Sequence, residues 1–223
     1  MERLRIGDPV EMGPYRLLGW LGAGGFGEVF LGCGGDEELA AVTVVRADYA
    51  ANPRFRARLA REVARVCTVR TPWVAAVLGA DTDTSTPWLA REYVAGPSLG
   101  QVVSTSGPLP ETVVGVLGAR LGGALAQLHT LGVTHGDLKP SNVLLAADGP
   151  RLIDFAIVRA LDSDSVTLVG GAFNSPAFMS PEQANGEDGG RASDVFSLAS
   201  VLVYAATAQG PFGETANPVA MLR

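Results

Sequence analysis

The chain has 223 residues, of which 47% are apolar and 18% are charged, and its net charge at pH 7 is −6. So much apolar sequence can form a sizeable core, which excludes a disordered protein, and an acidic chain without a basic patch is not expected to bind nucleic acid. Cys33 and Cys67 are isolated and lack metal-ligand spacing, so free thiols in a reducing compartment are expected.

Residues 1–14 form a polar lead-in that lacks the apolar core of a signal peptide. From Tyr15 to Leu31, short apolar runs surround a glycine cluster, and the β-branched run Leu39–Val45 predicts a buried strand. A helix is then predicted to open at Asn52-Pro53, with an apolar stripe made of Phe55, Leu59, Val63 and Val66.

Two further strands are predicted at Val74–Leu78 and Trp88–Val94. Residues 15–94 therefore predict a small, strand-rich lobe with one long helix. The composition changes at Gly96-Pro97-Ser98, which is typical of a hinge between two lobes.

Beyond this hinge the sequence is mainly helical. A helix is predicted from Pro110-Glu111 to about His129, with one apolar side that carries Val113, Leu117, Leu121, Leu125 and Leu128. Short strands are expected around Val143–Leu145 and Leu152–Ile153. The apolar stretch Val195–Ala208 is too short to span a bilayer and predicts a buried core helix. The whole chain is expected to be cytoplasmic. A membrane anchor beyond Arg223, in a longer protein, is the alternative.

The glycine cluster occupies the stretch from Leu21 to Val29. Glycines at 22, 24 and 27 let a backbone pass close to phosphate groups. A dinucleotide-binding fold would continue with a helix, but Glu28-Val29-Phe30-Leu31 reads as a strand. The strand–loop–strand order favours the form of this motif that kinases use, with an ordinary glycine-rich hairpin as the alternative.

The most specific motif runs from Val133 to Leu145, Val-Thr-His-Gly-Asp-Leu-Lys-Pro-Ser-Asn-Val-Leu-Leu, and resembles the catalytic loop of protein kinases. Phosphoryl transfer needs a base, a metal ligand and a cation close together. The resemblance implies that Asp137 accepts or orients the hydroxyl proton of the substrate, that Lys139 contacts the transferring phosphate, and that Asn142 binds magnesium.

Three later segments extend the resemblance. Asp154-Phe155-Ala156 resembles the family's Asp-Phe-Gly, with Asp154 as the main magnesium ligand and an alanine that restricts flipping of the segment. Ser180-Pro181-Glu182 matches the Ala-Pro-Glu that closes the activation segment, and Asp194 matches the aspartate that supports the catalytic loop. The chain resembles actinobacterial serine/threonine kinases over residues 15–223, with ATP expected at the hinge 92–97.

The resemblance implies an α+β fold with two lobes. Residues 15–94 would form a small antiparallel β lobe with one helix, and residues 95–223 a mainly helical lobe that is incomplete at its C-terminal end. The resemblance implies that Glu182 pairs with an arginine of the part that is missing here, and a buried carboxylate without its partner is costly. The chain is therefore expected to be either a fragment or a natural truncation in which another interaction compensates.

The sequence departs from the family at the ATP-binding lysine. The matching strand reads Ala41-Val42-Thr43, and Thr43 has neither the charge nor the reach of a lysine. The usual glutamate partner is retained as Glu62; alternatively, Glu62 lies at the edge of the apolar stripe and reaches solvent. Lys139 is the only lysine in the chain, so no other lysine can substitute. We hypothesise that Arg91, just before the hinge, pairs with Glu62 and partly fills this role; alternatively, Arg91 plugs the pocket or turns outward.

A second departure is Gly136, where many kinases carry an arginine that reads a phosphorylated activation loop. Without that arginine, control by loop phosphorylation is less expected for four candidate hydroxyls, on Ser163, Ser165, Thr167 and Ser175.

These features predict a serine/threonine protein kinase domain that binds ATP and Mg²⁺ and phosphorylates a protein substrate, with reduced activity because of Thr43. The alternatives are a pseudokinase, which would bind nucleotide or signalling partners without catalysis, and a small-molecule phosphotransferase of the aminoglycoside-kinase type. Lys139-Pro140 and the Ser-Pro-Glu segment disfavour the latter. The residues expected to bind the nucleotide are Leu21, Gly22, Gly24, Gly25, Phe26, Gly27, Val29, Ala41, Thr43, Glu62, Arg91, Glu92 and Val94.

Overall fold

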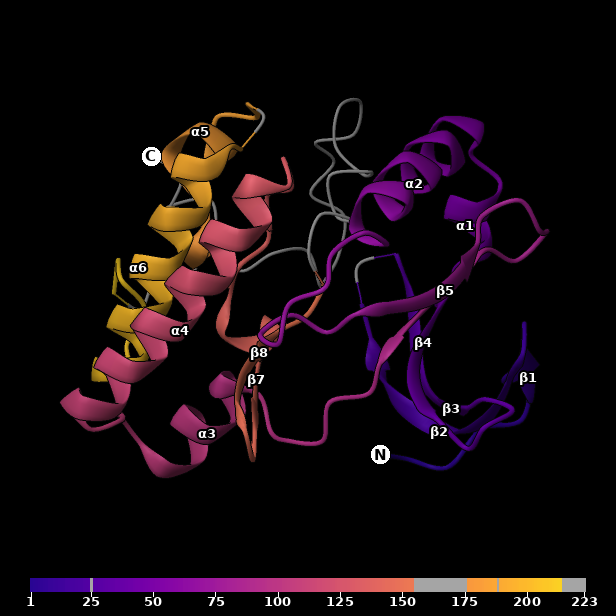
Figure 1. Cartoon of the computed structure of the whole chain (residues 1–223), viewed down its shortest axis with the longest axis horizontal. Helices are drawn as coiled ribbons and strands as arrows, with labels where there is room; N and C mark the ends of the chain where they lie inside the picture. Colours follow the sequence, from indigo (N-terminus) through magenta and orange to yellow (C-terminus); the bar gives the residue numbers. More distant parts are fainter. Residues whose placement is uncertain (25, 155–175, 188, 214–223) are drawn as a thin grey trace. The chain divides into compact units, whose positions relative to one another are not determined.

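A computed structural model of the chain describes residues 1–24, 26–154, 176–187 and 189–213 (Figure 1). The chain forms two compact units: Met1–Arg70 with Ala75–Val94, and Thr71–Val74 with the chain from Ala95 onward. The first unit is an antiparallel sheet with helices, and the second is mainly helical. This architecture confirms the predicted α+β fold class.

The first unit contains a six-stranded sheet in which every neighbouring pair is antiparallel. The strand order is β1-β2-β3-β4-β6-β5. The first four strands follow one another as a meander with short connections, whereas β4 pairs with β6, which comes only after two helices and β5. The strands are β1 (Glu11–Met12), β2 (Tyr15–Ala23), β3 (Gly27–Cys33), β4 (Leu39–Val45), β5 (Val77–Asp81) and β6 (Trp88–Glu92).

Strand alternation in β4 separates two environments. Ala40 and Val42 are fully buried in an apolar cluster with Phe30 and Ala90. Because side chains along a strand alternate between its two faces, Thr43 lies on the opposite face of the sheet from this cluster. The sheet therefore presents its buried apolar face on one side and the candidate lysine position on the other.

Two helices complete the first unit, α1 (Ala47–Ala50) and α2 (Pro53–Val66). The Asn52 side chain caps α2, since its oxygen accepts hydrogen bonds from the backbone nitrogens of Arg54 at 2.9 Å and Phe55 at 3.3 Å. The predicted start of this helix is confirmed. Its buried residues are the four of the predicted stripe, Phe55, Leu59, Val63 and Val66.

The second unit contains a short antiparallel pair of strands and several helices. The helices α4 and α6 pack against each other, and Leu117, Leu121, Leu125 and Leu128 of α4 are buried. None of the helices in the described ranges is long and apolar enough to cross a membrane. The elements are α3 (Leu99–Ser106), α4 (Glu111–Thr130), η1 (Pro140–Asn142), β7 (Val143–Ala146), β8 (Gly149–Leu152), η3 (Pro176–Phe178), α5 (Pro181–Ala184) and α6 (Arg191–Thr207).

Two predictions about strands and the lead-in are wrong in part. The strand predicted at Val74–Leu78 begins instead at Val77 and runs to Asp81, because Val74 belongs to the second unit and forms an isolated bridge with Leu152 there. The lead-in of residues 1–14 contains β1, which extends the sheet beside β2.

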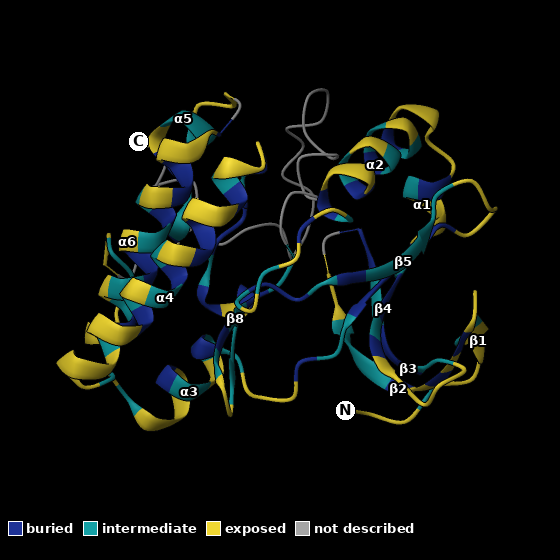
Figure 2. Ribbon diagram, viewed as in Figure 1, coloured by how far each residue is buried: buried dark blue, intermediate teal, exposed yellow. Residues whose placement is uncertain are grey.

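Two predictions about buried helix faces also need correction. Val113 lies in the first turn of α4 and is 46% exposed. Helix α6 is not buried all round: its ribbon has both buried and exposed stretches (Figure 2). Val195 and Val203 are exposed, and most of the buried residues of the helix are polar. These buried residues are Ser193, Asp194, Ser197, Ser200, Val201 and Ala205. Hydrogen bonds, and not apolar packing alone, therefore explain why α6 has a buried face.

Candidate active site

The glycine-rich segment of the first unit has the predicted strand–loop–strand order and joins two antiparallel strands. It connects β2 to β3, with Ala23 paired to Glu28, and the backbone nitrogen of Gly24 donates to the carbonyl oxygen of Gly27 at 2.8 Å. Leu21 and Val29 are half-buried on the two strands. Gly25 lies outside the described residues.

The glycines of this hairpin have different roles. A side chain at Gly22 would meet nothing within 4 Å, and one at Gly24 would only approach a carbonyl oxygen at 3.8 Å. At Gly27, a Cβ atom would collide with the backbone oxygen of Val44 and lie 3.2 Å from Cγ2 of Thr43. Gly22 and Gly24 thus leave open space of the kind a phosphate needs, whereas Gly27 allows β3 to approach β4.

Phe26, at the tip of the same hairpin, is buried. Its ring lies 6.1 Å from the ring of Phe55 on α2, measured between centroids. The structure thus gives Phe26 a packing role that links the hairpin to the helix that carries Glu62. A contact between Phe26 and a nucleotide stays a prediction.

Thr43 occupies the position of the missing lysine and is only 3% exposed. It lies in register with Val29 of β3 and Leu89 of β6, and Ala41, two residues earlier on the same face, is half-buried. A short hydroxyl side chain at this buried position cannot reach as far as a lysine ammonium would.

Arg91 and Glu62 are not arranged as we hypothesised. Arg91 is 6% exposed, and its Nη2 atom donates to Oγ1 of Thr43 at 3.3 Å. The Glu62 carboxylate instead accepts from Nη1 of Arg65, one turn further along α2, at 3.5 Å. The reason is geometric: Arg91 pairs with Ala41 across the β4–β6 ladder, which places its side chain beside the next residue on the same face, Thr43.

The last strand of the unit ends at the predicted hinge. Glu92 closes β6, its backbone nitrogen donates to the oxygen of Ala76 at 2.8 Å, and its carboxylate accepts from the nitrogen of Ala76 at 3.4 Å. Val94 is buried and is the last residue of the unit. Both residues are therefore held by their own unit, in the segment where nucleotide contacts are expected.

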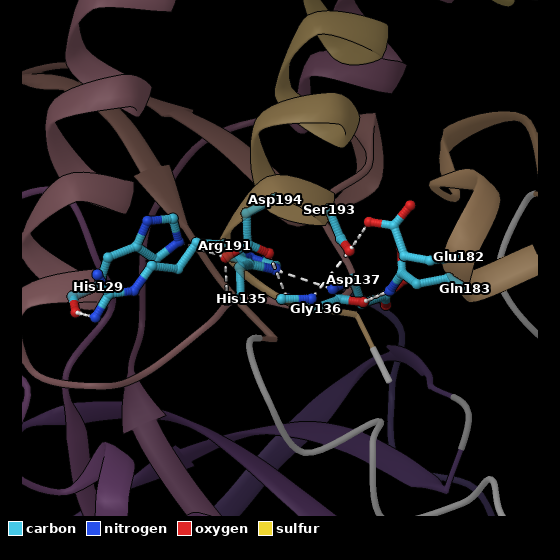
Figure 3. Close-up of polar contacts among 10 residues, drawn as sticks. His129, His135, Gly136, Asp137, Glu182, Gln183, Arg191, Ser193 and Asp194 are labelled. Carbon is cyan, nitrogen blue, oxygen red and sulfur yellow. Dashed lines mark hydrogen bonds and ion pairs between the residues drawn. The ribbon is translucent and has the colours of Figure 1, made fainter. Parts of the chain in front are cut away.

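In the second unit, Asp194 of α6 holds the candidate catalytic loop. Its Oδ2 atom accepts from the backbone nitrogen of His135 at 2.8 Å and lies 2.7 Å from Nε2 of His129, while its Oδ1 atom accepts from the nitrogen of Gly136 at 2.8 Å (Figure 3). Asp194 is 1% exposed. Its buried carboxylate is satisfied by these donors, which fix the backbone just before Asp137.

Asp137 lies in a buried polar cluster with a cation and an amide. Its Oδ2 atom is 2.9 Å from Nζ of Lys139 and 3.1 Å from Nδ2 of Asn142, whose amide also donates to the backbone oxygen of Asp137 at 2.8 Å. Burial raises the pKa of the Asp137 carboxyl group, and the Lys139 ammonium opposes that rise. A carboxylate with a raised pKa is a better proton acceptor than a solvated one.

Asn142 and Asp154 supply the donor set that suits a magnesium ion. The side-chain nitrogen of Asn142 faces Asp137, and its side-chain oxygen accepts from Oγ of Ser141 at 3.4 Å, which leaves a second lone pair of that oxygen for a ligand. The backbone nitrogen of Ile153 donates to the backbone oxygen of Asn142 at 3.0 Å. That bond brings the segment containing Asp154 next to Asn142. Carboxylate and amide oxygens are ligands that magnesium accepts, usually together with phosphates and water. The residues present therefore fit the ion.

The backbone of Asp154 has a φ of +59°, in the left-handed region that few non-glycine residues adopt. Such conformations concentrate at functional sites. Phe155 and Ala156, the four candidate phosphorylation sites and residues 214–223 lie outside the described residues.

The Ser180-Pro181-Glu182 segment is tied to α6. Ser193 donates its hydroxyl hydrogen to Oε1 of Glu182, and this hydrogen bond lowers the pKa of the Glu182 carboxyl group. In the same helix, Ser197 donates to the backbone oxygen of Phe178 at 2.7 Å. Within the described residues, Ser193 is thus a hydrogen-bond partner of the Glu182 carboxylate.

Sequence reasoning missed four of these residues: His129, Gln183, Ser193 and Ser197. Gln183 could have been found, because Ser180 and Gln183 form the Ser-x-x-Gln pattern of a capping box. The serines of α6 left a weaker signal, since an apolar helix with several serines reads as a core helix.

Buried His135 predicts a pH dependence of stability. Desolvation lowers its pKa, and the neutral ring accepts a hydrogen bond at Nδ1 from the nitrogen of Asp137 at 3.3 Å. The unfolded state has an ordinary pKa near 6.5, so it binds more protons than the folded state below that value. We expect the free energy of unfolding to fall as pH drops below about 6.5, by up to about 1.4 kcal/mol per pH unit.

Urea unfolding at several pH values tests this, with His135→Asn as the comparison, because asparagine can still accept at its oxygen but does not titrate. The raised pKa of Asp137 makes the free energy of unfolding rise as pH falls, which is opposite to the effect of His135. This contribution is the same in both proteins, so it cancels when their pH slopes are compared. An equally steep slope in His135→Asn would contradict the assignment to His135.

Comparisons with known proteins agree on one family. The model described as "Protein kinase domain" matches residues 15–221. The chain is 46% identical over 212 residues to the probable serine/threonine-protein kinase PkwA of Thermomonospora curvata, covering 95% of this chain and 29% of that protein. It is 44% identical over 220 residues to the serine/threonine-protein kinase AfsK of Streptomyces griseus, covering 98% of this chain and 27% of that protein. The chain thus spans less than a third of the length of these two relatives.

A solved structure is similar over nearly the whole chain. A variant of the Mycobacterium tuberculosis PknI kinase domain superposes with a TM-score of 0.76 at 25% sequence identity, covering 96% of this chain and 82% of that chain. The predicted family and fold are confirmed by these matches.

Proposed function

The chain belongs to the protein kinase family, and we propose that it binds ATP with Mg²⁺ and transfers the γ-phosphate to serine or threonine side chains of a protein substrate. The names of the two relatives described above support a serine/threonine kinase. We further propose that its rate is reduced, because Thr43 stands where the family has its ATP-binding lysine.

One observation carries this proposal: the cluster of Asp137, Lys139 and Asn142. A base, a cation and a metal ligand lie within one hydrogen-bonded group, and the base has a raised pKa. Phosphoryl transfer depends on such positioning and charge neutralisation more than on covalent chemistry.

In the proposed reaction, the substrate hydroxyl oxygen forms a bond to the γ-phosphorus as the bond from that phosphorus to the β–γ bridging oxygen of ATP breaks. The hydroxyl proton passes to the Asp137 carboxylate. Lys139 stabilises negative charge on the transferring phosphoryl group. Its ion pair with Asp137 keeps the ammonium beside the base, where that group would lie. Asn142 keeps the Asp137 carboxylate oriented by its two amide hydrogen bonds.

Asn142 and Asp154 would hold magnesium, which would neutralise charge on the phosphates when bound. The hydrogen bond between Ile153 and Asn142 supports this assignment, because it holds the segment that carries Asp154 beside Asn142. The left-handed backbone of Asp154 supports it as well, because such conformations concentrate at functional sites.

The first unit would contribute the nucleotide-binding residues. The open space beside Gly22 and Gly24 supports phosphate binding. The end of β6 at Glu92 and the buried Val94 that follows it support binding of the base. Loss of one preorganised charge in such a site lowers the rate by about 10²–10³-fold. A measurable but slow transfer is therefore expected.

A second candidate function is a pseudokinase that binds nucleotide without transferring phosphate. The buried hydrogen bond from Arg91 to Thr43 favours it, because it fills the lysine position with a pair that has no role in the family's mechanism.

A thermal-shift titration with ATP, with and without Mg²⁺, followed by a radiolabelled phosphotransfer assay tests the proposal. Magnesium-dependent binding with transfer to serine or threonine supports the kinase. Binding without transfer supports the pseudokinase, and failure to bind ATP would overturn both.

A further inference from the structure

Gln183 has a second contact beyond its role as a helix cap. Its Oε1 atom accepts from the backbone nitrogen of Ser180 at 3.1 Å and from the Ser180 hydroxyl at 3.2 Å, and its own backbone nitrogen donates to that hydroxyl at 3.4 Å. These bonds form the capping box of α5. They use the oxygen of the side-chain amide and leave its nitrogen for another partner.

That nitrogen reaches the candidate catalytic loop. Nε2 of Gln183 donates to the backbone oxygen of Gly136 at 2.8 Å, across 47 positions of sequence (Figure 3). Space for the side chain is provided by Gly189, which is buried: a Cβ atom at position 189 would lie 2.9 Å from Cδ, Cγ and Nε2 of Gln183. The Gln183 side chain therefore occupies space that any side chain at position 189 would take from it.

The Gly136 oxygen belongs to the peptide group that precedes Asp137. The other end of that peptide, the Asp137 nitrogen, donates to Nδ1 of His135 at 3.3 Å, and the nitrogen of Gly136 itself is held by Asp194. Gly136 has a φ of +73°, and a glycine has more backbone freedom than any other residue. Since position 136 has no side chain to fix it, its orientation depends on these backbone hydrogen bonds.

We propose that Gln183 is a positioning residue that orients the Gly136–Asp137 peptide and so couples the Ser180–Glu182 segment to the catalytic carboxylate. This inference rests on the proposed function of Asp137. Through Gln183, the segment around α5 would influence the orientation of Asp137, although Gln183 itself does not touch the reacting atoms.

The variant Gln183→Glu tests the proposal selectively. Glutamate keeps the acceptor for Ser180, as in the most common capping box, but replaces the donor to Gly136 with a carboxylate oxygen. A matched control exists in α3, where Ser98 and Gln101 form the same capping box with bonds of 2.8 and 3.1 Å. Gln101→Glu makes the same chemical change on an exposed residue, with no bond to the catalytic loop.

Two readouts are measured for both variants: kcat with the KM for ATP, and hydrogen exchange of the amides in residues 134–139. For Gln183→Glu we expect kcat to fall by about 3- to 10-fold at unchanged KM, and exchange to accelerate by a similar factor, from the strength of one hydrogen bond. Loss of that bond should lower Tm by only about 2–4 °C, so the domain stays folded in the assay. Gln101→Glu should leave both unchanged.

The outcomes separate this inference from the proposed function. If the wild-type domain transfers phosphate and Asp137→Asn abolishes transfer, an unchanged kcat or unchanged exchange in Gln183→Glu overturns the positioning role alone. If the wild-type domain transfers no phosphate, the proposed function fails. Hydrogen exchange in Gln183→Glu then decides the inference. Faster exchange supports the positioning role of Gln183, and unchanged exchange overturns it.

Discussion

Replacing Asp137 with asparagine is expected to lower kcat by about 10²–10⁴-fold while Tm stays the same or rises. The fall in kcat follows from loss of the general base, since an amide does not accept a proton at neutral pH. The effect on Tm follows from the raised pKa of Asp137: the folded state holds this carboxylate in its charged form less favourably than the unfolded state does, and a neutral amide removes that penalty.

Steady-state phosphotransfer and thermal unfolding, measured on the same preparations, test this prediction. Asp148→Asn is the matched control, because Asp148 is an exposed aspartate of the same unit that also pairs with a cation, Arg151. The control should retain wild-type kcat. A loss of less than about 3-fold in Asp137→Asn would contradict the role of Asp137 as the base.

Restoring the family's lysine is expected to succeed only when Arg91 is removed as well. Thr43→Lys alone places an ammonium beside the buried guanidinium that now bonds to Thr43, so we expect a lower Tm and little gain in rate. In Thr43→Lys with Arg91→Thr, the like-charge repulsion is gone. Glu62 can then pair with the lysine, since its present partner Arg65 is 63% exposed and such pairs are weak.

For the double variant we expect kcat/KM for ATP to rise by about 10²–10³-fold over wild type. The four proteins of this cycle are compared by phosphotransfer and ATP titration, with Thr86→Lys, an exposed position in the same unit, as the control for added charge. Arg91→Thr alone should weaken ATP binding if the guanidinium contributes to it. An equal gain from Thr43→Lys alone would show that Arg91 does not oppose the lysine.

Most of the fold could be predicted from local patterns. The capped, amphipathic α2 and the β-branched β4 match their predicted ranges, because in both cases one strong periodicity coincides with clear boundaries. The strand near Val74 was misplaced because apolar residues there are buried in two different units, and sequence does not record which unit a residue joins.

The candidate site could likewise be predicted only where its contacts join residues close together in sequence. Asp137, Lys139 and Asn142 lie within six residues of each other, so their motif implied their proximity, and the structure brings them together. The partners of Arg91 and Glu62 could not be predicted, because they depend on strand register and on competition between neighbouring side chains. The contact of Gln183 with Gly136 joins residues far apart in sequence, which no local pattern encodes.

The position of Lys139 beside Asp137 also allows the candidate active site to be labelled selectively. Because Lys139 is the only lysine, an amine-directed reagent has one side-chain target in the whole chain, besides the terminal amine of Met1. Lys139 is 21% exposed, so it is accessible to a small reagent, and a nucleotide phosphate beside it would shield it. Protection of a single peptide in a mass spectrum would therefore report ligand binding at the catalytic loop, whether or not phosphate is transferred.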